Sequence, residues 1–158
     1  MDMTLYDDYP LSQHFTLREM LVTATGYGNT PSDAVLPNLR RLAMTMELVR
    51  SALGDHPIKI SSAFRSALVN HAVGGAKTSA HLIGLACDFT CWGFGSPTEI
   101  CIAVIDANID YDQLIDEERT GPDGSRSNWV HLGIGPRTRH QVLTSTTPGK
   151  YTPGLRQP

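Results

Sequence analysis

The sequence has few cysteines and no extended apolar run, and each absence excludes a class of protein. Three cysteines stand among 158 residues. They form no CxxC pair, and their odd count argues against a disulfide framework. No stretch approaches the roughly 20 apolar residues that a membrane-spanning helix needs. We therefore expect a chain that folds around a core of its own and does not insert into a membrane.

An excess of positive charge is also missing. The formal net charge is -3, from 13 basic and 16 acidic residues, and the basic side chains are scattered. Binding to a phosphate backbone relies on clustered positive charge. We expect no nucleic-acid partner.

The N-terminal stretch MDMTLYDDYPLSQHFTL lacks the features of a secretory signal. It carries acidic residues where a signal peptide is basic, and it has no apolar segment. We expect synthesis in the cytoplasm without a signal peptide, so that any action outside the cell requires release by another component.

The composition is that of one folded domain. Hydrophobic residues make up 41% of the chain and charged residues 18%, a globular balance. No internal repeat is present. We assign residues 1–136 to a single domain and residues 137–158, which show little period, to a C-terminal tail that we expect to be partly disordered.

Helix signals are clearest at three places. Thr16 and Glu19 have the spacing of a capping box, and Ser96, Pro97 and Glu99 mark a second helix start. Between them lies the strongest helical period of the chain, which ends at Gly54. Its apolar stripe consists of Leu36, Leu39, Leu42, Ala43, Met46, Val49 and Leu53.

Strand signals alternate with these helices. The segments HPIKISSAFRS, LACDFTC, YDQLIDEE and NWVHLGIG are predicted strands, and SALVNHAV is a short helix after Ser66. The order predicts an α+β fold in which helices pack on a small, mainly antiparallel sheet.

Three side chains of this pattern are candidate metal ligands. In SAHLIGLACDF, Gly84 allows the chain to turn between His81 and Asp88. In NWVHLGI the apolar residues alternate, so His131 points away from the core. A catalytic zinc ion takes three protein ligands and leaves one position for water. His81, Asp88 and His131 are therefore a candidate open site of two histidines and one carboxylate.

A structural or redox site made of Cys87, Cys91 and His81 is the competing interpretation. Cys87 is next to Asp88 in the sequence, and neighbouring side chains of a strand point to opposite faces. The direction of Cys87 argues against this alternative.

Several ordered motifs resemble one family. SAHLIGLACD matches the SxHxxGxAxD motif of the zinc D-Ala-D-Ala peptidases, which include vancomycin-resistance dipeptidases and phage endolysins, with hedgehog domains as distant relatives. LSQHFTLREM, SSAFRS, YDQLIDE and WVHL resemble further segments of the phage and prophage branch. The resemblance covers residues 11–135 and implies the fold of these peptidases.

The resemblance implies roles for individual residues. His81, Asp88 and His131 would be the ligands of one catalytic Zn²⁺ ion. Arg65 matches the arginine that stabilises the oxyanion formed from the substrate carbonyl. Ser79 matches a serine near the substrate, which binds it or braces a metal ligand.

The general base is where the sequence departs from the family pattern. Many relatives carry an acid three residues before the last histidine or a second histidine two residues before it. Asn128 and Trp129 stand there instead, and neither accepts a proton from water. An acid of the phage-like branch aligns with Glu117, which we predict to be the base, with Asp116 and Glu118 as alternatives because the strand phase is open.

The function implied by the resemblance is that of a zinc metallopeptidase. It would be D-Ala-D-Ala carboxypeptidase-like or L-alanyl-D-glutamate endopeptidase-like and would cut a peptide bond in peptidoglycan stem peptides or cross-links. We expect a monomeric phage or prophage endolysin, released through a holin-type lesion or carried in the virion. The alternative, motivated by Asn128 and Trp129, is a catalytically inactive zinc-stabilised binding or structural module.

Overall fold

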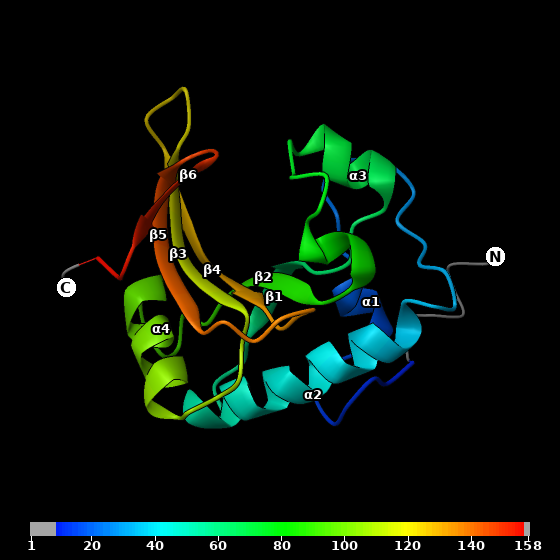
Figure 1. Cartoon of the computed structure of the whole chain (residues 1–158), viewed down its shortest axis with the longest axis horizontal. Helices are drawn as coiled ribbons and strands as arrows, with labels where there is room; N and C mark the ends of the chain where they lie inside the picture. The colour runs from blue at the N-terminus through cyan, green and yellow to red at the C-terminus, as the bar shows by residue number, and fades with distance from the viewer. Residues whose placement is uncertain (1–8, 157–158) are drawn as a thin grey trace.

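A six-stranded sheet forms the centre of the protein, of which the computed structural model describes residues 9–156 (Figure 1). Across the sheet the strands run in the order β1-β2-β4-β3-β5-β6. All neighbouring pairs are antiparallel except β3 and β5, which are parallel. The bounds are β1 Lys59–Ser62, β2 Ala86–Thr90, β3 Gln113–Thr120, β4 Arg126–Gly133, β5 Gln141–Thr147 and β6 Lys150–Pro153.

Within residues 9–156, four α-helices and a short 3₁₀ helix accompany the sheet, which confirms the predicted α+β class. They are α1 Leu17–Met20, α2 Leu36–Ala52, α3 Ala67–Ala72, η2 Ala80–Ile83 and α4 Pro97–Asp106. The helix starts predicted at Thr16 and Ser96 both form capping boxes, with Glu19 and Glu99 reaching back to the cap residues. These local hydrogen bonds satisfy amide groups that a helix start leaves unpaired.

The core lies between one face of the sheet and the helices α2 and α4. The apolar stripe of α2 is buried at Leu39, Leu42, Ala43, Met46 and Val49. It packs in one cluster with strand residues such as Leu114, Val130 and Leu132. In Figure 1 α4 and α2 lie along one side of the curved sheet, and α3 and η2 face its other side. The second face is therefore left for polar chemistry.

The C-terminal segment differs from the tail that the sequence suggested. We placed the end of the domain at residue 136, but residues 137–156 contain β5 and β6, which belong to the same sheet. β5 pairs with β3 over five residues, from Gln113 opposite Gln141 to Glu117 opposite Ser145. The edge of β3 offers unpaired amide and carbonyl groups, and a partner strand satisfies them whatever its apolar period.

Within residues 9–156, no helix has both the length and the apolar character needed to cross a bilayer.

Candidate metal centre

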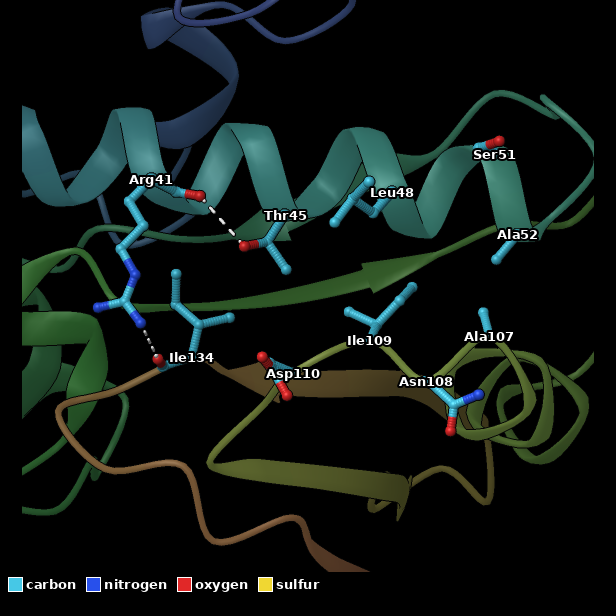
Figure 2. Close-up of a pocket in the computed structure, with 10 residues that line it drawn as sticks. All are labelled: Arg41, Thr45, Leu48, Ser51, Ala52, Ala107, Asn108, Ile109, Asp110 and Ile134. Carbon is cyan, nitrogen blue, oxygen red and sulfur yellow. Dashed lines mark hydrogen bonds between the residues drawn. The ribbon is translucent and has the colours of Figure 1, made fainter.

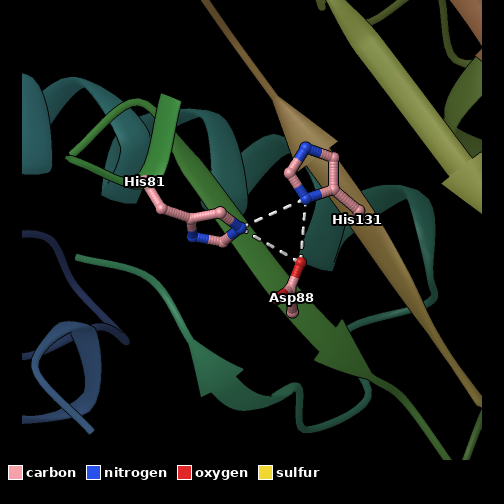
Figure 3. Close-up of side chains that lie close together, drawn as sticks. All are labelled: His81, Asp88 and His131. Atoms are coloured by element: carbon pink, nitrogen blue, oxygen red, sulfur yellow. Dashed lines mark hydrogen bonds and ion pairs between the residues drawn. The ribbon is translucent and has the colours of Figure 1, made fainter. Parts of the chain in front are cut away.

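Three elements bring His81, Asp88 and His131 together on the sheet face opposite the core (Figure 3). His81 comes from η2, Asp88 from β2 and His131 from β4. Asp88 and His131 are direct partners in the β2–β4 pairing, so their side chains stand side by side. Their neighbours Val130 and Leu132 are fully buried on the core face. The alternation predicted for this strand is therefore observed.

The donor atoms of the three residues have the spacing of a tetrahedral metal site. His131 Nδ1 lies 2.9 Å and His81 Nε2 lies 3.3 Å from Asp88 Oδ1, and the two nitrogens are 3.2 Å apart. Tetrahedral zinc with bonds of about 2.0–2.1 Å holds its ligand atoms about 3.3 Å from one another. Two imidazole nitrogens and one carboxylate oxygen thus fit a zinc ion and leave its fourth position open.

Backbone geometry explains how His81 reaches the site. Gly84 ends η2 in the left-handed region, with φ 69°, and turns the chain into β2. A Cβ atom at this position would lie 2.8 Å from Val35 Cγ1. His81 Nδ1 donates to the Ala63 carbonyl at 2.6 Å, so its proton lies on Nδ1 and Nε2 is free for a metal. The bend and the hydrogen bond together aim His81 at Asp88.

The charge state of the cluster suits a cation. Burial lowers the pKa of His81, although Asp88 opposes the shift, and so favours the neutral imidazole that binds metals. Burial alone would raise the pKa of Asp88, but His81 and His131 lower it well below its usual range. A carboxylate whose pKa is lowered in this way stays ionised and suits a cation.

Arg65 also lies at this centre. Its Nη2 donates to Asp88 Oδ2 at 2.5 Å, and its Nε donates to Ser62 Oγ at 2.8 Å. The Arg65 amide donates to the His81 carbonyl at 3.1 Å, which ties the arginine to η2. The structure thus brings Arg65 to the ligand cluster, where its guanidinium engages the oxygen of Asp88 that the histidines leave free.

Ser79 caps the element that carries His81. Its hydroxyl accepts from the His81 amide at 3.3 Å, at the N-cap of η2. The resemblance implied that Ser79 either binds the substrate or braces a metal ligand. The contact with His81 is of the bracing kind, and direct binding of substrate by Ser79 stays a prediction.

The register of β3 shows which sheet face each of its three consecutive acids, Asp116, Glu117 and Glu118, points to. Ile115 is opposite His131 and Glu117 is opposite Trp129, so Glu117 shares the face of the metal cluster. Burial raises the pKa of Glu117, and the charges of His131 and Asp88 act on it in opposite directions. Asp116 points the other way, where Thr98 Oγ1 donates to it at 2.6 Å.

Glu118 does not face the metal cluster either. It shares the Asp116 face and pairs with Arg156 at 2.8 Å. Of the three acids, Glu117 is therefore the one placed for a role beside the metal.

Sequence reasoning missed the partner of Glu117. Arg119 Nη2 donates to Glu117 Oε2 at 2.7 Å, and the Arg119 guanidinium lies over the Trp129 ring, 5.4 Å from its centroid. The available signal was the i, i+2 spacing of Glu117 and Arg119, which puts both on one strand face. Its meaning depended on the position of Trp129 across the strand pair.

The cysteine alternative is not formed. The Cys87 thiol is fully buried on the core face, with Sγ 3.4 Å from Met46 Sδ. Cys91 is also buried. Within residues 9–156, the only cluster of metal-binding side chains is His81, Asp88 and His131.

A hollow of about 580 Å³ lies elsewhere, between α2 and the loop that follows α4 (Figure 2). Arg41, Leu48, Ile109 and Asp110 are among its lining residues. None of the predicted site residues lines it, so the candidate chemistry belongs to the metal cluster.

Comparisons with known proteins identify the family of the chain. The Peptidase M15 family matches residues 13–119, more than half of the chain. This region includes Arg65, His81, Asp88 and Glu117, and His131 joins them through the β2–β4 pairing. The zinc D-Ala-D-Ala carboxypeptidase of Streptomyces albus G is 29% identical over 113 residues, which are 70% of this chain and 43% of that protein. The alignment spans less than half of that relative. This chain belongs to the peptidase M15 family, the zinc D-Ala-D-Ala peptidases that its motifs indicated.

Proposed function

We propose that this protein is a zinc-dependent peptidase that hydrolyses a peptide bond in peptidoglycan stem peptides or cross-links. The observation that carries the proposal is the convergence of His81 Nε2, Asp88 Oδ1 and His131 Nδ1 at tetrahedral ligand spacing. Membership of the M15 family and the likeness to a zinc D-Ala-D-Ala carboxypeptidase support the class of substrate.

The residues around the cluster have different roles in the proposed hydrolysis. His81, Asp88 and His131 would hold a zinc ion, which would act as a Lewis acid toward water and the substrate carbonyl. Glu117 accepts the proton of the attacking water on its carboxylate and returns it to the leaving amine. The Glu117 side chain is 11% exposed, so a substrate that covers it would remove it from bulk water.

Arg65 supplies positive charge where the substrate carbonyl oxygen becomes negative. Its guanidinium is anchored by Ser62 and Asp88 and its side chain is 15% exposed. A donor held in place before the reaction costs little reorganisation when charge develops. Ser79 holds η2 and therefore the direction of His81.

Digestion of purified peptidoglycan tests the proposal. Zinc-loaded protein is expected to release peptide fragments, and a chelator is expected to stop the release until zinc is restored. Mass spectrometry of the fragments identifies the bond that is cut. Tight zinc binding without any release of fragments would instead support an inactive zinc-stabilised module, the reading that Asn128 and Trp129 motivated.

For the biological setting we propose a phage or prophage endolysin, supported by the resemblance of SSAFRS and YDQLIDE to that branch. Co-expression with a holin in a bacterial host is expected to cause lysis that Glu117→Gln abolishes. Equal lysis by both forms would contradict this setting and leave the peptidase assignment to the digestion assay.

A further inference from the structure

The ion pair between Glu117 and Arg119 fixes one oxygen of the proposed base. Arg119 Nη2 engages Glu117 Oε2 at 2.7 Å, and within residues 9–156 the structure records no hydrogen bond to Oε1. The side chains are 11% and 23% exposed, so this contact is largely shielded from solvent. A carboxylate held through one oxygen presents the other in a defined direction.

Arg119 is itself held from three sides. Its Nη1 donates to the Glu118 carbonyl at 2.7 Å and to the Ser145 carbonyl of β5 at 2.9 Å. Its guanidinium lies over the ring of Trp129 on β4. Contacts to β3, β4 and β5 leave the arginine little rotational freedom, and its planar group matches several acceptors at once.

Trp129 contributes its ring face rather than a hydrogen bond. Its Nε1 is buried and has no hydrogen-bond partner among the residues that the structure describes. Trp129 is opposite Glu117 in the strand register. The tryptophan therefore forms a flat support for Arg119 directly across from the proposed base.

We propose that Arg119, supported by Trp129 and by the Ser145 carbonyl, is a positioning residue that holds the Glu117 carboxylate in place for proton transfer. The inference rests on the proposed function, since it matters only if Glu117 is the base. It also gives the C-terminal strand β5 a part in the site, because the Ser145 carbonyl is one of the contacts that hold Arg119.

Steady-state kinetics of the zinc-loaded protein on a defined muropeptide test the inference. Arg119→Ala is expected to lower kcat about 10- to 100-fold with KM within about threefold, because small misplacements of catalytic groups cost rates of this order. Millimolar guanidinium ion is expected to restore part of the kcat of Arg119→Ala. Arg119→Lys is expected to have a lower kcat than wild type, since an ammonium lacks the planar fork of the guanidinium. Arg126→Ala, an exposed arginine on β4, is the matched control.

Variants of Trp129 provide a second measurement should Arg119→Ala fold poorly. Trp129→Phe keeps a ring face and loses no hydrogen bond, so its kcat is expected to stay within about threefold of wild type. Trp129→Ala is expected to lower kcat as Arg119→Ala does. Zinc content and thermal midpoint are measured for each variant, so that loss of metal or fold is separated from loss of positioning.

The outcomes separate this inference from the proposed function. If wild type shows no zinc-dependent hydrolysis, or Glu117→Gln keeps full activity, the proposed function or its base fails. If Glu117→Gln is inactive while Arg119→Ala keeps the wild-type kcat, only the positioning role is overturned. A change in KM alone would overturn it as well, because Arg119 would then bind substrate directly.

Discussion

Asp116 and Glu117 are neighbours in the sequence but point to opposite faces of β3. Asp116 is fully buried on the helix side, where it binds Thr98 and Arg156. Glu117 lies on the metal side beside Arg119. Because side chains alternate along a strand, Asp116 is a structural carboxylate while the next residue, Glu117, is the candidate catalytic one.

Glu117→Gln is expected to lower kcat about 100- to 10,000-fold while zinc content stays unchanged, because an amide cannot take the proton of water. Kinetics with metal analysis check this result. Glu118→Gln is the control and should keep its activity, because Glu118 lies on the opposite face of β3 from the metal cluster. Equal losses in both variants would contradict the assignment of the base to Glu117.

Replacement of Asp88 by Asn is expected to abolish stoichiometric zinc binding, because it removes the anionic ligand that both histidines contact. Metal content after dialysis against a weak chelator measures the effect. The double variant Cys87→Ser/Cys91→Ser should keep its zinc, since Cys87 faces the core. Loss of zinc from the cysteine variant would revive the cysteine site.

Arg156→Ala is expected to destabilise the fold by about 3 kcal/mol, because it leaves the buried Asp116 charge with Thr98 as its remaining side-chain partner. Arg156 also pairs with Glu118, so the C-terminal segment is bound to β3 by side chains as well as by β5. Denaturant unfolding of wild type, Arg156→Ala and the exposed-residue control Arg126→Ala measures the difference. A change below about 0.5 kcal/mol, typical of surface sites, would show that the pair contributes little.

Asp112→Asn is expected to lower the thermal midpoint at neutral pH but not in acid. Hydrogen bonds from Arg139 depress the pKa of Asp112 in the folded protein. The stabilisation that the Asp112–Arg139 pair contributes is therefore fully present above the unfolded-state pKa of Asp112, about 3.9. It is lost as the pH falls through the lower folded-state pKa. Melting curves from pH 7 downward should show the two proteins converging, and a gap independent of pH would contradict this account.

Gly84→Ala is expected to destabilise the protein by about 2–4 kcal/mol, from left-handed strain together with the clash of the new Cβ against Val35 and Leu39. Gly74 is the matched control, because its φ is 71° and a Cβ there meets nothing within 4 Å. Gly74→Ala should therefore show the conformational cost alone. Similar thermal shifts for the two variants would mean that close packing at Gly84 is unimportant.

The elements that sequence alone could determine are those whose signals are local. A capping box needs only the residues from Thr16 to Glu19 or from Ser96 to Glu99, and both boxes are formed as predicted. The apolar stripe of α2 and the alternation around His131 likewise follow from the helix and strand periods. These signals were enough for the α+β class and for the motif that contains His81 and Asp88.

Tertiary structure decided what depends on a partner strand. The three consecutive acids of β3 look alike in sequence, and only the pairing of Glu117 with Trp129 across β4 selects one of them. β5 shows little apolar period in the sequence, yet it pairs with β3 over five residues and supplies hydrogen-bond partners to that edge. The contacts of Arg119 to Trp129 and Ser145 join three strands. Long-range register of this kind is set by the packed sheet as a whole, because no short segment contains both members of such a pair.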